Sequence, residues 1–214
     1  MTDLASSLID GYFSDTERIL TALRPQLQNA FPRLAFLLDT ARCNGRTIFV
    51  MGNGGSAAAA SHLANDLNKY TIVDRQRRYK CLALTDSAPL IMAWANDAAY
   101  SEIFVEQLRN LMEPGDVLVG ISGSGNSLNC VKAMQYAREV GGTTVSWTGY
   151  GGGRMAEYAD LSIVIPSDSM VHCEDAHVVI HHCLVTLLKA ELEAIVHDTL
   201  IGPAATVVRA KPTT

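Results

Sequence analysis

The stretch TIFVMGNGGSAAAASHLANDL occupies residues 47–67 and joins three patterns in a fixed order. Residues 47–52 are apolar and rich in β-branched side chains, which predicts a short buried strand. The loop GNGGS (52–56) follows, and the alanine-rich residues 56–69 then predict a helix. A strand, a glycine-rich loop and a helix in this order are the repeating unit of an open α/β sheet.

The rest of the chain repeats this alternation. Further strands are predicted at 79–85, 116–122, 143–149 and 161–166, and helical patterns cover 86–110 (interrupted around Asn96-Asp97), 127–140 and 173–197. Strands that alternate with helices predict parallel pairing, because each crossover helix returns the chain to the same end of the sheet. We therefore expect an α/β fold with a doubly wound parallel sheet of five strands, flanked by helices.

Residues 3–44 precede the first strand and show apolar stripes at helical spacing, among them Leu4, Leu8 and Phe13. A break near Pro25 or Pro32 predicts two helices, that is, an N-terminal helical hairpin. No strand precedes these stripes, so we expect them to pack on the main domain or on a partner subunit. The predicted division is N-terminal helices in residues 1–45, an α/β domain in 46–198 and a tail in 199–214.

Charge and composition exclude several classes of partner. The chain has 214 residues and a net charge of −5, which argues against a nucleic-acid surface. Its apolar runs fall short of the roughly 20 residues that a membrane span needs, and its N-terminus lacks the basic start of a signal peptide. Five widely spaced cysteines form no C-x-x-C pair. We expect a cytoplasmic protein with reduced thiols.

A second glycine- and serine-rich loop, SGSGNS (122–127), ends the third predicted strand as GNGGS ends the first. Parallel sheets present ligands beyond the carboxyl ends of their strands, where amides at helix N-termini attract anions. Gly54 and Gly123 allow close approach of the backbone, and serine hydroxyls add donors. Neither loop matches the nucleotide P-loop pattern. The first loop also fails the dinucleotide pattern G-x-G-x-x-G, since residue 57 is alanine. The pair of loops predicts a phosphate site.

Three segments resemble a known family. MGNGGSAAAASHLANDL (51–67), DVLVGISGSGNSLNCVKAM (116–134) and TGYGGGRMAEYADLSIVIPS (148–167) are similar to the sugar isomerase (SIS) domain, and more narrowly to the phosphoheptose isomerases. The resemblance runs from about residue 5 to 195. It implies an aldose–ketose isomerase acting on sedoheptulose 7-phosphate, and a homotetramer with sites at subunit interfaces. It also implies that Ser56, Ser122, Ser124 and Ser127 bind phosphate and that Asn53 and Asp97 contact the sugar.

The resemblance places the chemistry on two helices. It implies that His62, Asp66, Glu174 and His182 bind a divalent metal, expected to be zinc, and that Asp66 and His182 act as base and acid. Glu174 is also implied as a substrate contact. The family carries glutamate in place of Asp66, glutamine in place of Glu174, and a basic residue where this chain has Tyr70. His181 is an alternative acid, because it lies seven residues from Glu174 on nearly the same helix face.

Two other functions remain open at this point. The SIS fold also occurs in tetrameric, non-catalytic adaptors of replication initiation and in sugar-phosphate sensors. Adaptors lack the imidazole and carboxylate set, whereas this chain has His62, an acid at 66 and His182. Sensors normally carry a fused DNA-binding domain, for which this sequence has no room. The sequence therefore favours an isomerase.

Overall fold

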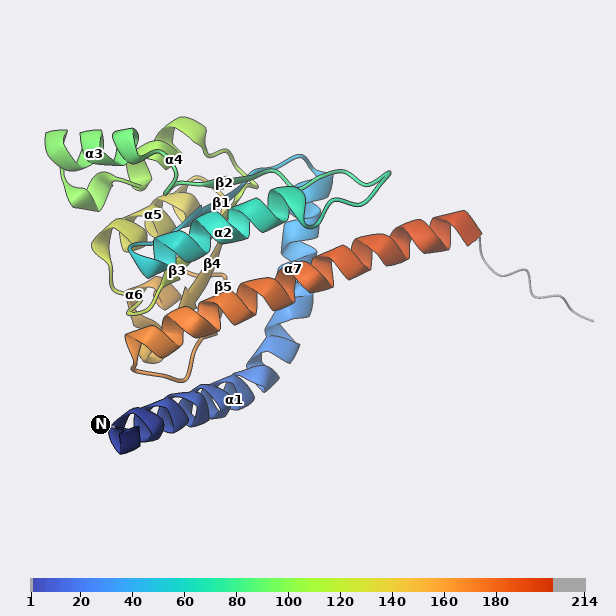
Figure 1. Cartoon of the computed structure of the whole chain (residues 1–214). Coiled ribbons are helices and arrows are strands. Elements are labelled where there is room, and N and C mark those ends of the chain that lie inside the picture. Colours follow the sequence, from blue (N-terminus) through green and yellow to red (C-terminus); the bar gives the residue numbers. More distant parts are fainter. Residues whose placement is uncertain (1, 202–214) are drawn as a thin grey trace, which may run out of the picture.

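Five parallel strands form one sheet in the computed structural model, which describes residues 2–201 (Figure 1). The strands are β1 (Ile48–Met51), β2 (Cys81–Ala83), β3 (Val117–Ser122), β4 (Thr143–Thr148) and β5 (Leu161–Val164). Their order in the sheet is β2-β1-β3-β4-β5, so the direction of winding reverses at β1. The predicted doubly wound five-stranded sheet is confirmed.

Helices cover both faces of this sheet (Figure 1). One face carries α1 (Thr2–Cys43), α2 (Gly55–Lys69) and α7 (Met170–Ile201), whose apolar residues form one core cluster with the sheet. The other face carries α3 (Ala88–Asp97), α4 (Val105–Leu111), α5 (Leu128–Glu139) and α6 (Gly153–Glu157) around a second cluster. Two short 3₁₀ turns, Tyr100–Glu102 and Tyr150–Gly152, link these elements.

The N-terminal segment differs from the predicted hairpin. Residues Thr2–Cys43 form one helix with Pro25 and Pro32 inside it, so the prediction of two helices is wrong. A proline inside a helix removes one backbone hydrogen bond and bends the axis, and Figure 1 shows α1 changing direction along its length. Leu23, Phe31 and Leu34 are buried on either side of the two prolines. Burial on both sides holds the turns together, and the helix bends without ending.

The first turns of α1 leave an apolar stripe uncovered. Leu4, Leu8, Ile9 and Phe13 are each 57–66% exposed, although Tyr12 donates a hydrogen bond to Asp175 of α7. Large apolar side chains gathered on one helix face usually mark a contact with another molecule. Within residues 2–201 no helix is both long and apolar enough to cross a membrane. The exposed apolar side chains themselves make the stripe a candidate contact with another molecule.

His177 lies in the middle of α7 and is completely buried. Burial lowers the pKa of this imidazole to about 4, and the backbone of Trp147 opposes the shift in part. An unfolded histidine titrates near 6.5, so the unfolded chain binds a proton at His177 more readily than the folded chain. The contribution of His177 to folding is complete above pH 6.5 and declines as the pH falls toward 4.

This buried imidazole predicts acid sensitivity that a neutral side chain removes. Between pH 7 and pH 5 the wild type should lose about 2 kcal/mol more of its free energy of unfolding than a His177→Leu variant. Denaturant titrations of both proteins at the two pH values measure this difference. Equal losses in the two proteins would show that His177 does not cause the acid sensitivity.

Candidate functional site

The first glycine-rich loop joins β1 to α2. Gly54 lies at φ 56° and ψ −123°, a conformation that favours glycine, and its carbonyl accepts hydrogen bonds from the amides of Ala57 and Ala58. A Cβ on Gly52 would lie 2.5 Å from the Ser56 carbonyl oxygen, so the loop closes tightly on itself. Ser56 is buried at the start of α2. The loop thus directs the first amides of α2 toward the edge of the sheet, as an anion site requires.

The second loop, residues 122–127, joins β3 to α5. The Ser122 hydroxyl oxygen accepts a hydrogen bond from the amide of Gly125, which lies at φ 64°. The Ser124 hydroxyl oxygen accepts from the Asn126 amide. Ser127 is the residue that precedes α5, yet its hydroxyl makes no capping hydrogen bond to that helix. The Ser127 side chain is therefore available to an incoming ligand.

Strand pairing brings the two loops together. β1 and β3 are neighbours in the sheet, with Met51 opposite Gly120, so the loops leave adjacent strand ends. The side chains of Asn53 in the first loop and Asn129 at the start of α5, just after the second loop, exchange two hydrogen bonds of 3.0 and 2.8 Å. The structure therefore places the predicted phosphate-binding residues of both loops at one edge of the sheet.

A third glycine-rich loop, residues 149–153, supports the second. Four consecutive residues have positive φ: Tyr150 (45°), Gly151 (72°), Gly152 (104°) and Gly153 (56°). A Cβ on Gly153 would lie 2.5 Å from the Ser124 carbonyl oxygen. The three glycines therefore let this loop pack against the second loop. In the sequence this loop is the run GYGGG, which belongs to the third segment of the resemblance, and the run alone does not indicate that it packs on the second loop.

Two predicted contacts, Glu174 and Asp97, differ in what their side chains touch. The Glu174 carboxylate packs against Gly55, where a Cβ would collide with it. Asp97 ends α3, is exposed, and accepts a hydrogen bond from its neighbour Asn96. Three residues further on, the Tyr100 hydroxyl donates to Asn53 Oδ1 over 2.9 Å, which ties this segment to the first loop. Glu174 is thus placed beside the phosphate loops.

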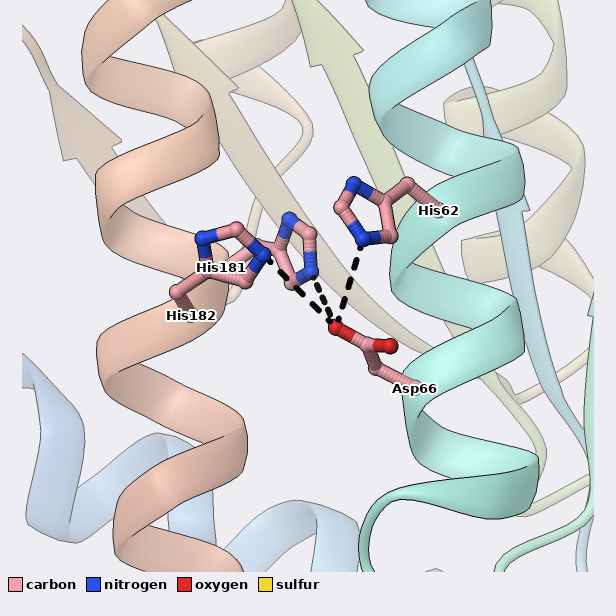
Figure 2. Close-up of side chains that lie close together, drawn as sticks. All are labelled: His62, Asp66, His181 and His182. Atoms are coloured by element: carbon pink, nitrogen blue, oxygen red, sulfur yellow. Dashed lines mark hydrogen bonds and ion pairs between the residues drawn. The ribbon is translucent and has the colours of Figure 1, made fainter.

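A second centre lies further along the same pair of helices (Figure 2). It consists of His62 and Asp66 from α2 and His181 and His182 from α7, and one ligand atom of each lies within 4.8 Å of all the others. The Asp66 Oδ2 atom is 2.7 Å from His181 Nε2, 3.6 Å from His62 Nε2 and 3.9 Å from His182 Nε2. Three imidazoles therefore converge on one carboxylate oxygen.

Glu174 is not part of this group, although the resemblance implied it as a metal ligand. It precedes His181 by seven residues, which is about 10 Å along a helix. Its carboxylate instead meets Gly55, at the start of α2. Within the described chain the structure brings together His62, Asp66 and His182, adds His181, and leaves Glu174 apart.

Burial and hydrogen bonding set the charge of the group. Burial raises the pKa of Asp66, but the hydrogen bond with His181 and the nearby imidazoles outweigh it, so the pKa lies below its ordinary value. Burial lowers the pKa of His181, and the Asp66 hydrogen bond offsets this only in part. Near neutral pH Asp66 is therefore a carboxylate and His181 a neutral imidazole. These are the protonation states that metal ligands need.

The two neighbouring histidines differ in access. His181 is completely buried, whereas the side chains of His182 and His62 are 52% and 46% exposed. Helical spacing favours His181 only as the alternative acid.

An open pocket of about 360 Å³ is lined by His62, Asp66, Tyr70, His182, Val185 and Thr186. Lys189 lies 4.7 Å from the centre of the Tyr70 ring, which brings a cation next to the residue that replaces the family's basic side chain.

Comparison with known proteins identifies the family of this chain. The family description of the SIS domain matches residues 11–149. A phosphoheptose isomerase from Geotalea daltonii is 37% identical over 82% of the chain and 91% of its own length. The chain belongs to the SIS domain family and, within it, to the phosphoheptose isomerases. A relative from Akkermansia muciniphila with the same name is 40% identical over 72% of this chain and 80% of its own.

Solved structures share the whole fold. The phosphoheptose isomerase of Neisseria gonorrhoeae is 28% identical, covers 86% of this chain and 98% of its own, and has a TM-score of 0.81. That of Francisella tularensis is 27% identical, covers 89% of this chain and 100% of its own, and has a TM-score of 0.82. A likeness that covers nearly all of each solved chain extends beyond the matched loops to α7, which carries His181 and His182.

The loop geometry predicts the energetic weight of two hydroxyls. Replacing Ser124 and Ser127 by alanine should weaken binding of inorganic phosphate roughly five- to a hundred-fold, at about 0.5–1.5 kcal/mol for each lost neutral hydrogen bond. Calorimetric titration of the double variant measures the change. Ser14→Ala, on the exposed surface of α1, serves as the control. Phosphate affinity equal to that of the wild type would remove these serines from the site.

Proposed function

We propose that this chain isomerises sedoheptulose 7-phosphate to D-glycero-D-manno-heptose 7-phosphate with the help of a divalent metal. The observation that carries the proposal is the convergence of His62, His182 and the Asp66 carboxylate on the helix pair that also borders the phosphate loops. The family membership supports the reaction class. The paired loops support a phosphorylated substrate, because they bring glycine backbone and serine hydroxyls together at adjacent strand ends.

The residues fit a zinc ion. Ligand atoms about 2.0–2.1 Å from a tetrahedral zinc lie roughly 3.3 Å from one another. The Asp66 Oδ2 atom lies 3.6 Å from His62 Nε2 and 3.9 Å from His182 Nε2, so small side-chain movements reach that geometry. Three protein ligands would leave the fourth position open, as catalytic zinc sites do. We propose His62, Asp66 and His182 as the ligands.

His181 then orients Asp66 without being a required ligand. Its Nε2 atom lies 2.7 Å from Asp66 Oδ2, a hydrogen-bond distance, and its ring is buried. Aspartate is one methylene shorter than the glutamate that the family carries, and this hydrogen bond holds the shorter side chain in place. An imidazole that supports a metal-binding carboxylate is a common outer-shell arrangement.

The reaction moves a proton between adjacent carbons through an enediolate. A bound divalent ion supplies Lewis-acid stabilisation of the developing negative charge. We propose that the Asp66 carboxylate removes the proton from carbon through Oδ1, the oxygen not assigned to the metal, since Asp66 is ionised near neutral pH. His182 is the acid at the oxygen through Nδ1, the ring nitrogen not assigned to the metal, because its ring is half exposed to the pocket whereas His181 is buried. The serine loops hold the phosphate and thereby fix which carbons face these groups.

The spacing of the two centres favours a site shared between subunits. Ser56 and Asp66 are ten residues apart on α2, or about 15 Å along the helix axis. An extended seven-carbon sugar phosphate is shorter than this. We propose a homotetramer in which the phosphate loops and Glu174 of one subunit face the histidine group of another. The exposed apolar stripe on α1 offers a surface for that assembly.

The runner-up function is a non-catalytic, tetrameric adaptor. The same fold and loops would serve it, and Asp66 would then be too short to reach a substrate carbon. Against it stands the retained group of three imidazoles around a carboxylate, which a protein that only docks on a partner does not need. Metal content and turnover separate the two functions.

The cytoplasm is the compartment we propose. All five cysteines are free thiols, with Cys81, Cys130 and Cys173 buried and Cys43 and Cys183 exposed. Burial raises the pKa of the Cys81 and Cys173 thiols, which keeps them protonated and unreactive. Exposed free thiols suit a reducing compartment.

The chemical centre predicts a specific pattern of loss. His182→Ala should lower turnover of sedoheptulose 7-phosphate about 10²- to 10⁴-fold, the usual contribution of a general acid, while phosphate binding stays nearly intact. Asp66→Glu restores the family residue and should keep measurable turnover. Metal analysis of the purified wild type should find about one divalent ion per chain, since residues 2–201 carry one such group.

The contrary result is equally definite. If the wild type and Asp66→Glu both fail to convert sedoheptulose 7-phosphate and neither retains metal, the isomerase proposal is wrong and the adaptor takes its place. Thr186→Ser, at the edge of the pocket and not among the proposed ligands, is the matched control for changes in α7.

The assembly predicts a mass four times the 23.1 kDa of one chain in light scattering at micromolar concentration. Phe13→Asp puts a charge in the exposed apolar stripe and should dissociate the tetramer and abolish turnover together. Ser14→Asp introduces the same charge on the adjoining face of α1 and should leave the mass unchanged. A monomeric wild type would exclude the shared site.

A further inference from the structure

The side chain of Asn53 is held by a polar network that the proposed reaction has not yet used. Asn53 lies in the first loop and is half buried, while Asn129, at the start of α5, is only 2% exposed. Their carboxamides form a closed pair, with Asn53 Nδ2 donating over 3.0 Å and Asn129 Nδ2 donating back over 2.8 Å. Two reciprocal hydrogen bonds fix both side chains in one plane.

The polarity of this pair follows from a backbone group. The amide N–H of Cys130 can only donate, and it donates to Asn129 Oδ1 over 2.9 Å. Because the Cys130 amide fixes Oδ1 of the Asn129 carboxamide, the other atom must be Nδ2. This nitrogen donates to Asn53 Oδ1, while Asn129 Oδ1 accepts from Asn53 Nδ2. The orientation of the Asn53 carboxamide is thus set by the start of α5, although oxygen and nitrogen have nearly the same shape.

Tyr100 completes the network from the segment after α3. Its hydroxyl donates to Asn53 Oδ1 over 2.9 Å, so this oxygen accepts from both Tyr100 and Asn129. A carbonyl oxygen has two lone-pair positions, and both are now occupied. The side chain of Asn53 therefore has no acceptor position left for a ligand.

One N–H of Asn53 remains for a ligand. The nitrogen carries two hydrogens, and Asn129 Oδ1 takes one. The other has the Cys130 sulfur at 3.9 Å, a long contact to a weak acceptor. Burial raises the pKa of this thiol to about 12, so the sulfur is not a thiolate. A sugar oxygen would be the stronger acceptor.

We propose that Asn129 and Tyr100 are positioning residues that force Asn53 to meet the sugar as a hydrogen-bond donor. This inference rests on the proposed function, since it states which group of the substrate that site recognises. The group it recognises is an acceptor oxygen, either the carbonyl or the enediolate oxygen that forms from it. Inorganic phosphate, held by the serine loops, does not need this donor.

Asn129→Asp removes the hydrogen bond that Asn129 donates to Asn53 and keeps the other hydrogen bonds of the network. The new carboxylate still accepts from the Cys130 amide, so the start of α5 is retained, but it no longer donates to Asn53 Oδ1. The affinity for sedoheptulose 7-phosphate should fall roughly ten-fold or more, as for a polar group left without its partner, while affinity for inorganic phosphate changes less than about two-fold. Tyr100→Phe should lower sugar-phosphate affinity by about two- to ten-fold.

Calorimetric titration of the full chain with sedoheptulose 7-phosphate and with inorganic phosphate measures both affinities. Tyr136→Phe, seven residues further along α5 than Asn129 and beside Arg109, is the control for loss of a tyrosine hydroxyl. The inference is overturned if Asn129→Asp keeps the wild-type preference for the sugar phosphate. It is also overturned if both affinities fall together, since a merely structural role would act on both.

Turnover of the wild type is measured separately. A wild type that binds the sugar phosphate in preference to phosphate but does not convert it would overturn the proposed isomerase, while the affinity ratios of the variants would still decide the role of Asn129. A wild type without that preference would overturn the positioning role as well.

Discussion

The parallel pairing of β1 with β3 is the constraint on which the site depends. It brings two strand ends, and hence two glycine-rich loops, to the same edge of the sheet. The fit leaves no room for a side chain, because a Cβ on Gly52 would lie 2.9 Å from the Ile121 carbonyl oxygen. The loop amides can face one anion only because the backbones approach so closely.

The second constraint is the direction of α2 and α7, which lie side by side with their N-termini at the same end (Figure 1). Gly55 faces Glu174 at that end, and seven residues later His62 faces His181. Each helix therefore carries a residue of the phosphate region and a residue of the histidine group. The rise of 1.5 Å per residue keeps the two regions apart within one chain.

Local patterns in the sequence predicted the fold well. The five strands, the two phosphate loops and the interruption near Asp97 follow from apolar runs, glycine and helix ends. The single bent α1 could not be predicted, because proline signals a break and the burial of Leu23 and Leu34 that overrides it is tertiary. The place of Glu174 also depends on which residue of α2 lies opposite, and helical spacing within α7 does not contain that information.

His181 shows best why a candidate site needs the fold as well as the motif. From sequence, adjacent histidines at 181 and 182 are nearly equivalent, yet one is buried against Asp66 and the other opens to the pocket. A buried imidazole–carboxylate pair costs desolvation, and apolar residues of similar volume would stabilise a fold at least as well. The pair therefore contributes little that the core requires. What it does provide is a carboxylate held ionised beside the neutral His181 imidazole, the state from which Asp66 can bind a cation or accept a proton.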